Sequence, residues 1–275
     1  MPSTITTAIV MFDSGMLEFD FMRNAFAAAG LVGAVAGMVG YFLVLRGQTF
    51  AGHALSHVGF AGATGAVLVG LSPLMGMTGF TVAAGVAMAF LGERLAGRDV
   101  AIGVVLTLSL GLGLLFLNLH SHAATQATAL LFGNVLAVDE ATLSILALLS
   151  VAVLVVLAAI ARPLLFASLQ PELAEAKGVP LRAVGVAFMV LVALTVAQAA
   201  QIVGVLLVFA LMVGPPAAAA RLTRRLGLGI LLAAVLAVVE SWAGLVLAYY
   251  TDWPTSFWIA TLSALVYLAS LVRRR

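Results

Sequence analysis

The sequence predicts an all-α, polytopic membrane protein built as a bundle of transmembrane helices. Of its 275 residues, 64% are hydrophobic and only 9% are charged, whereas soluble domains have about 45–50% apolar and about 25% charged residues. The apolar residues fall in runs of roughly 17 to 25, the length that a helix needs to cross the hydrocarbon core. A transmembrane β-barrel would instead show short segments of alternating polarity. We therefore expect a helical bundle embedded in lipid.

The rest of the composition narrows the function. The chain has no cysteine, which removes disulfides, thiolate catalysis and thiolate metal ligands. Its sequence pI is about 9.4, but the net charge is only +2, so we do not expect a nucleic-acid partner. There is no G-x-x-x-x-G-K-[ST] nucleotide motif and no hydrolase signature such as G-x-S-x-G or H-E-x-x-H. An enzyme is not predicted, and any ATP-driven step would use the nucleotide site of another subunit.

Nine apolar runs separated by polar residues are candidate spans. The break between the sixth and seventh is marked only by Gln198 and Gln201, which could also line a pathway or form hydrogen bonds between helices. Together the runs predict a single transmembrane domain over residues 21–272. The nine candidate spans are residues 21–45, 50–71, 76–93, 99–119, 141–161, 183–199, 202–220, 226–249 and 255–272.

The distribution of basic residues predicts the orientation. With the N-terminus outside, Arg23 is the only Lys or Arg near the outer face, and all the others lie on the cytoplasmic side, as the positive-inside rule requires. An odd number of spans then places the C-terminus in the cytoplasm. Residues 1–20 lack the basic region and the cleavage site of a signal peptide. We expect them to remain as an extracytoplasmic N-terminal segment.

Two segments between the spans differ from ordinary loops. Residues 121–138, on the outer side, are apolar but too short to span, which predicts a re-entrant or interfacial segment buried against protein. Residues 167–182 predict a short cytoplasmic helix, because Pro171 suits a first helical turn and Gly178 suits a helix end. This helix is either a capped surface helix or a docking element for a partner. The docking residues would be Pro171, Glu172, Leu173, Ala174, Glu175, Ala176, Lys177 and Gly178.

The strongest candidate for chemistry is a pair of histidines, His53 and His57, in the second apolar run. Residues four apart lie on one face of a helix with their Cβ atoms about 6 Å apart, which suits two ligands of one metal ion. Ionisable residues are rare in membrane spans and usually face a pathway or a partner. The alternative is a pair of neutral histidines hydrogen-bonded across helices, and the spacing alone does not decide between the two.

Three other residues are candidate metal ligands. Glu240 is the only carboxylate deep within a predicted span, where an unpaired charge costs about 2.5–3.5 kcal/mol. It could complete a site with His53 and His57 from the eighth span, or form a structural hydrogen bond. His120 and His122 follow the fourth span on the outer side. They could bind an arriving ion or simply be hydrated at the membrane interface.

Five stretches in the same order resemble the permease subunits of the bacterial zinc/manganese ABC importers, from about residue 20 to 272. Residues 41–68 resemble the family's basic turn and D-A-L-S-H span, with the sequence YFLVLRGQTFAGHALSHVGFAGATGAVL. Residues 99–105, DVAIGVV, resemble its fourth-span opening, and residues 130–138, LLFGNVLAV, its outer segment. Residues 171–182, PELAEAKGVPLR, resemble its ATPase-docking element, and residues 203–222 its run VGVLLVFALMVGPPAAAARL.

This resemblance implies an inner-membrane permease with the architecture of the vitamin B12 and metal-chelate importers. It implies a homodimer or pseudo-dimer of permeases, two ABC ATPase subunits docked at residues 167–182, an extracytoplasmic metal-binding protein, and import by alternating access. The cargo would be Zn²⁺ or Mn²⁺, held in transit by His53 and His57, with no permanently bound cofactor. The family commonly has Asp where this chain has His53. Exchange of a carboxylate for an imidazole favours zinc over manganese.

Two other transporter classes stay open at this point. A related ABC permease for an iron chelate or a vitamin would share the architecture but would need a wider, less charged pathway. A proton-coupled secondary transporter could use Glu240 and the histidines as a proton relay, and would favour inverted repeats with matching broken helices. No such repeats are visible in the sequence. Metal binding by the histidine pair discriminates among these functions.

Overall fold

The computed structural model describes residues 14–94, 98–119 and 130–272, and the regular structure within these ranges is entirely helical. The predicted all-α class is therefore confirmed. Each of the nine predicted apolar runs corresponds to one long helix, although several boundaries differ. The elements are η1 (Ser14–Glu18), α2 (Asp20–Leu45), α3 (Thr49–Leu68), α4 (Pro73–Arg94), α5 (Arg98–Asn118), η2 (Val135–Ala137), α7 (Glu140–Leu169), α8 (Pro171–Ala176), α9 (Leu181–Val203), α10 (Val208–Leu222), α11 (Leu226–Thr251) and α12 (Thr255–Val272).

By length and composition, seven of the described helices could cross a membrane: α2, α4, α5, α7, α9, α11 and α12. Helix α10 is apolar but only 15 residues long. Helix α3 has 20 residues, but two histidines and several glycines lower its hydropathy. The number of nine spans and the N-out orientation stay predictions.

Two predicted boundaries were wrong. Gln198 and Gln201 do not separate two helices, because both lie within α9, and the chain breaks later, at residues 204–207. Gln198 instead accepts a hydrogen bond of 2.8 Å from the hydroxyl of Ser150 on α7, so its amide joins two helices in the core. Helix α7 extends past the predicted end at residue 161 to Leu169, and therefore takes up the start of the segment 167–182.

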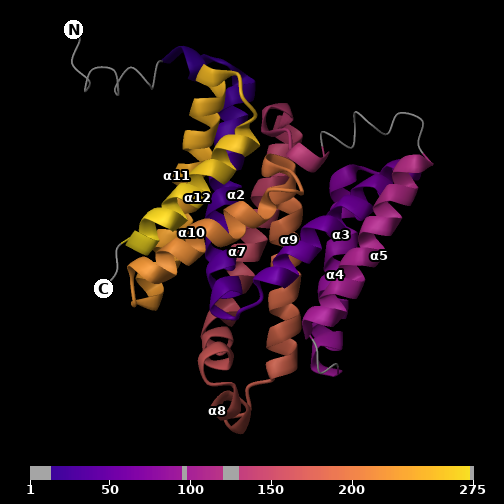
Figure 1. The fold of residues 1–275 in the computed structure, drawn as a ribbon, viewed down its shortest axis with the longest axis vertical. Helices are drawn as coiled ribbons and strands as arrows, with labels where there is room; N and C mark the ends of the chain where they lie inside the picture. Colours follow the sequence, from indigo (N-terminus) through magenta and orange to yellow (C-terminus); the bar gives the residue numbers. More distant parts are fainter. Residues whose placement is uncertain (1–13, 95–97, 120–129, 273–275) are drawn as a thin grey trace.

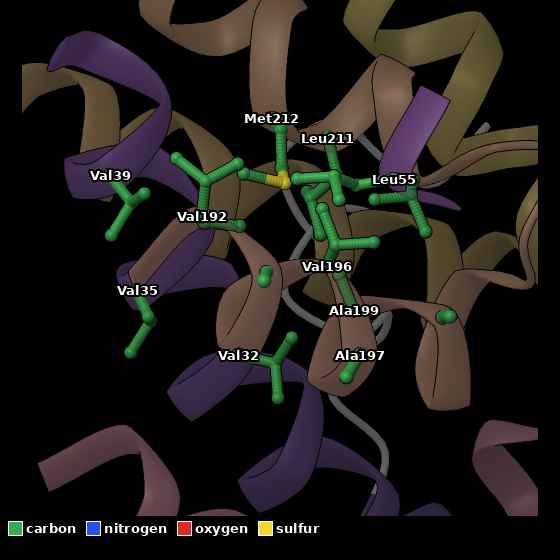
Figure 2. Close-up of a cluster of buried hydrophobic side chains, with 14 of the residues drawn as sticks. Val32, Val35, Val39, Leu55, Val192, Val196, Ala197, Ala199, Leu211 and Met212 are labelled. Atoms are coloured by element: carbon green, nitrogen blue, oxygen red, sulfur yellow. The ribbon is translucent and has the colours of Figure 1, made fainter. Parts of the chain in front are cut away.

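Helix α2 lies near the centre of the molecule and packs against α7, α9, α10 and α11 (Figure 1). Helices α3, α4 and α5 form a second group that contacts α9, while α12 packs on α10 and α11. Aliphatic side chains from α2, α3, α9 and α10 fill the core between these groups. Figure 2 shows them as Val32, Val35, Val39, Leu55, Val192, Val196, Ala197, Ala199, Leu211 and Met212.

Glycines let α2 approach its neighbours closely. A Cβ atom at Gly37 would lie only 2.5 Å from the carbonyl oxygen of Ala233 on α11, and one at Gly40 would overlap the carbonyl oxygen of Met212 on α10. Small residues are favoured between membrane helices because lipid gives no hydrophobic driving force, so that close van der Waals packing must hold the helices together. The glycines at positions 33, 37 and 40 follow one another at helical spacing, which places them on one face of α2.

The break between α9 and α10 is held by the described part of the predicted outer segment. Gly133 and Gly204 have φ angles of 76° and 82°. A Cβ atom on either residue would overlap the backbone of the other. Irregular backbone is tolerated at membrane depth only where protein or water satisfies its polar groups, and residues 130–134 do so here. The backbone N–H groups of Asn134, Val205 and Leu206 donate to the carbonyl oxygens of Gln201, Leu130 and Leu131, respectively. The rest of the segment, 121–129, lies outside the described residues.

The two ends of the bundle differ. Helix η1 and the turn between α11 and α12 lie at one end, and α8 lies at the other (Figure 1). Aromatic rings gather at the turn, where Trp253 and Trp258 stack with their centroids 5.6 Å apart. Tyr and Trp side chains are enriched at membrane interfaces. The turn therefore has the composition expected where α11 and α12 leave the lipid.

Candidate functional site

The histidine pair lies on one open face of α3. The rings of His53 and His57 have centroids 4.9 Å apart and are nearly perpendicular, at 88°, as expected for residues one turn apart. All residues from Ala51 to Thr64 are buried except the two histidines, which are partly exposed. The helix thus packs its apolar residues into the bundle and turns its two imidazoles toward the space beside it. This arrangement favours a pathway role over a core role.

Phe209 on α10 borders this face. Its ring centroid lies 5.4 Å from that of His53, at an interplanar angle of 78°, and its side chain is 39% exposed. The next residue, Ala210, lines a groove of about 300 Å³ between α10 and α12. Phe209 itself also lines this apolar groove, and so it lies between the groove and the ring of His53. The sequence contained no signal for this contact, because Phe209 lies in an apolar run whose facing side cannot be read from its spacing.

Glu240 is buried in α11, with 2% of its surface exposed. Neither carboxyl oxygen has a hydrogen-bond partner among the described residues. Ser263 on α12 lies beside the carboxyl group, but its hydroxyl donates to the backbone carbonyl of Ala210 at 2.8 Å. A buried polar group without a partner is costly, so Glu240 needs a proton, an ion or another molecule near it.

The structure does not bring Glu240 and the histidine pair together as one three-ligand site. Within the described ranges, no group of three or more His, Asp or Glu residues could hold a metal ion. The reason is the position of α10, where Phe209 contacts His53 while the carbonyl of Ala210 faces Ser263 beside Glu240. One turn of α10 therefore stands between the two candidate groups. His120 and His122 lie outside the described residues.

The short helix predicted within residues 167–182 is present as α8, six residues between α7 and α9; its cytoplasmic location stays a prediction. Pro171 occupies its first turn, and Gly178, with a φ angle of 80°, ends it in the left-handed conformation. The N–H groups of Gly178 and Val179 donate back to Glu175 and Ala174, which is a Schellman motif. Of its residues only Ala174 is buried. An exposed, rigidly capped helix at the end of the bundle is suited to contact with a partner.

The sequence matches a known family of membrane transport proteins. The model of the ABC 3 transport family matches residues 18–274, almost the whole chain. The chain belongs to the ABC 3 transport family. As a family member, it is a multi-span protein of the bacterial inner membrane. The predicted localisation and the predicted family are confirmed.

Similar proteins cover nearly the full length of this ABC 3 family member. The manganese transport system membrane protein MntC of Halalkalibacterium halodurans is 31% identical over 246 residues, which cover 89% of this chain and 84% of that protein. The manganese import system permease protein ScaB of Streptococcus gordonii is 31% identical over 260 residues, covering 94% and 93%. The structure of PsaBC from Streptococcus pneumoniae in complex with Fab has a TM-score of 0.86 and 30% identity, covering 96% of this chain and 95% of that one.

Proposed function

We propose that the chain is the membrane-spanning subunit of an ATP-driven importer of divalent transition metal ions. The observation that carries this proposal is the His53–His57 pair, which faces open space from a helix that otherwise packs into the bundle. The names of MntC and ScaB, which describe manganese transport and import, support the same class of cargo. Together these features favour metal import over transport of a chelate or a vitamin.

The histidine pair would bind the ion only in transit. Two imidazoles supply two of the four ligands that zinc prefers, so water, a second copy of the chain or a changed conformation must supply the others. A pathway site has to release its ion as well as bind it, and an incomplete ligand set favours release. Phe209 beside His53 would limit water on one side of the site.

For the identity of the ion, we propose zinc over manganese. Imidazole nitrogen suits zinc, whereas manganese prefers carboxylate and other oxygen ligands. The described residues around the pair offer no carboxylate for a joint site. The names of MntC and ScaB describe manganese transport and import, which supports manganese instead. Any assay should therefore compare the two ions.

Energy would come from a separate ABC ATPase subunit that docks on α8. This helix is exposed, begins at Pro171 and is capped at its C-terminal end by the hydrogen bonds of Gly178 and Val179, and α7 and α9 connect it directly to the bundle. Closure of the ATPases on ATP would move α8, and the permease would alternate between outward and inward access. An extracytoplasmic metal-binding protein would deliver the ion at the opposite end.

A second copy of this chain would complete the pathway. Ionisable residues within membrane spans face a bundle interior or a water-filled cavity rather than lipid, yet His53 and His57 are partly exposed in a single chain. The apolar groove between α10 and α12 lies next to them. A partner permease over this face would enclose both histidine pairs between the two copies.

Accumulation of metal by cells tests this function. In a bacterial host without its own high-affinity zinc and manganese importers, co-expression of this chain with its ATPase and binding protein should restore zinc accumulation, and manganese accumulation to a smaller extent. The control omits only this chain. Restoration of neither ion at verified membrane insertion would contradict the proposal.

The same assay examines the basis of the ion preference. His53→Asp restores the carboxylate that the family commonly has at this position, so the ratio of manganese to zinc accumulated should rise, by roughly tenfold if the donor exchange is worth about 1.4 kcal/mol. His57→Asp is the matched variant one turn away. An unchanged ratio in both variants would place ion selection elsewhere in the protein.

A further inference from the structure

The turn between α2 and α3 fixes the position of Arg46 relative to the histidine pair. Only residues 46–48 join the two helices. The N–H groups of Gly47 and Gln48 donate back to Val44 and Leu43, each at 3.0 Å, and Gly47 has a φ angle of 63°. This is a Schellman motif, which gives a helix end a defined exit direction. The backbone of Arg46 is therefore held in a defined position relative to the start of α3.

Arg46 contacts both helices that carry α8. Its Nη1 atom donates a 3.0 Å hydrogen bond to the hydroxyl of Ser168, in the last turn of α7. Its guanidinium carbon lies 5.5 Å from the ring centroid of Phe188 on α9, within the range of a cation–π contact. Since α8 is the short connection between α7 and α9, a single side chain bridges both of its flanking helices to the turn before α3.

The chemistry of the contact requires arginine. A planar guanidinium can stack on an aromatic ring and donate in its own plane at the same time, and it stays charged at all physiological pH values. The acceptor is itself oriented, because the Ser168 hydroxyl donates to the carbonyl of Leu164 one turn earlier in α7. A displacement of the end of α7 or α9 would therefore move Arg46, and with it the first turns of α3 that hold His53.

We propose that Arg46 is a positioning residue that couples movement of α8 to the geometry of the His53–His57 pair. The proposal rests on the proposed function, in which α8 receives the ATPase and the pair holds the ion. It adds a mechanical route between them, from α8 through its two flanking helices to the α2–α3 turn. Loss of Arg46 would uncouple ATP hydrolysis from ion movement without removing an ion ligand or a docking residue.

The test measures the number of ATP molecules hydrolysed per zinc ion accumulated, in proteoliposomes that contain the complete importer complex. Arg46→Ala should retain ATP hydrolysis but raise this ratio by about tenfold, within the roughly 5- to 150-fold range of typical coupling between sites. Ser168→Ala, which keeps the arginine, should shift the ratio in the same direction by a smaller factor, and Arg46→Lys should not restore it. Arg162→Ala removes an exposed arginine from the same helix, α7, and should leave the ratio unchanged.

Three results separate the possible failures. If Arg46→Ala and Ser168→Ala both transport zinc with the wild-type ratio, or if hydrolysis and transport fall in proportion, the coupling role is overturned. If Arg46→Ala does not assemble, the ratio in Ser168→Ala decides alone, and a wild-type value again overturns the proposal. If the wild-type complex accumulates no zinc or manganese with ATP, the proposed function itself fails.

Discussion

Replacement of both His53 and His57 by alanine is expected to abolish metal uptake while the protein still inserts and folds. The two imidazoles are the paired donors on the open face of α3, so their loss leaves no nitrogen ligand at this point of the pathway. Even loss of an outer-shell partner of a metal ligand typically costs about 10- to 100-fold in affinity or activity. We expect a fall in zinc accumulation of at least about 100-fold, measured at equal protein levels in the membrane.

The controls separate a metal site from a structural pair. Ser56 lies between the histidines but on the buried face of α3, where its hydroxyl donates a hydrogen bond to the carbonyl of His53. The Ser56→Ala variant should keep most of the zinc uptake. The double variant should also keep its thermal unfolding temperature in detergent close to that of the wild type, because neither side chain is fully buried. Unchanged uptake in the double variant, or a large loss of thermal stability that accounts for the loss of uptake, would make the pair structural.

Replacement of Gly204 by alanine is expected to cause the largest loss of stability. The residue has φ 82° and ψ 156°, a region that only glycine occupies readily. An added Cβ atom would also overlap Phe132 and Gly133 of the outer segment. Backbone strain of about 1–3 kcal/mol and overpacking of about 1–3 kcal/mol together predict a loss of about 2–6 kcal/mol. A lower unfolding temperature in detergent would report it.

Gly178→Ala is the matched control for this variant. Gly178 ends α8 with a φ angle of 80°, but nothing lies within 4 Å of an added Cβ atom. It therefore carries the milder strain of a left-handed residue without the overlap, and its cost should be only about 1–2 kcal/mol. Equal effects of the two substitutions would show that the contact between residues 133 and 204 does not stabilise the junction.

Much of the fold could be predicted because the bilayer imposes simple rules on a sequence. Runs of apolar residues long enough to cross lipid correspond one by one to the long helices, and the glycines of α2 lie where that helix meets α10 and α11. Pro171 and Gly178 predicted a short helix whose ends the structure places at Pro171 and Ala176. These features depend on local chemistry or on a periodic pattern, both of which a single sequence contains.

The features that could not be predicted depend on contacts between distant segments. The break after α9 begins at Gly204 rather than at the glutamines, because the backbone of residues 130–134 forms hydrogen bonds with residues 201–206. Likewise, Glu240 is the right type of residue for a metal site, but α10 separates it from the histidines. From the sequence, Arg46 is simply a basic residue at the end of the first apolar run. Only the structure shows that its side chain contacts Ser168 and Phe188.

ATP-dependent accumulation of zinc and manganese in proteoliposomes tests the central claim most directly. The purified complex of this chain with its ATPase should concentrate metal inside vesicles, loaded through the binding protein, when ATP is supplied on the cytoplasmic side of the permease. Zinc should accumulate faster than manganese, and neither should accumulate without ATP. Accumulation by this chain alone, driven by a proton gradient and independent of ATP, would contradict the account.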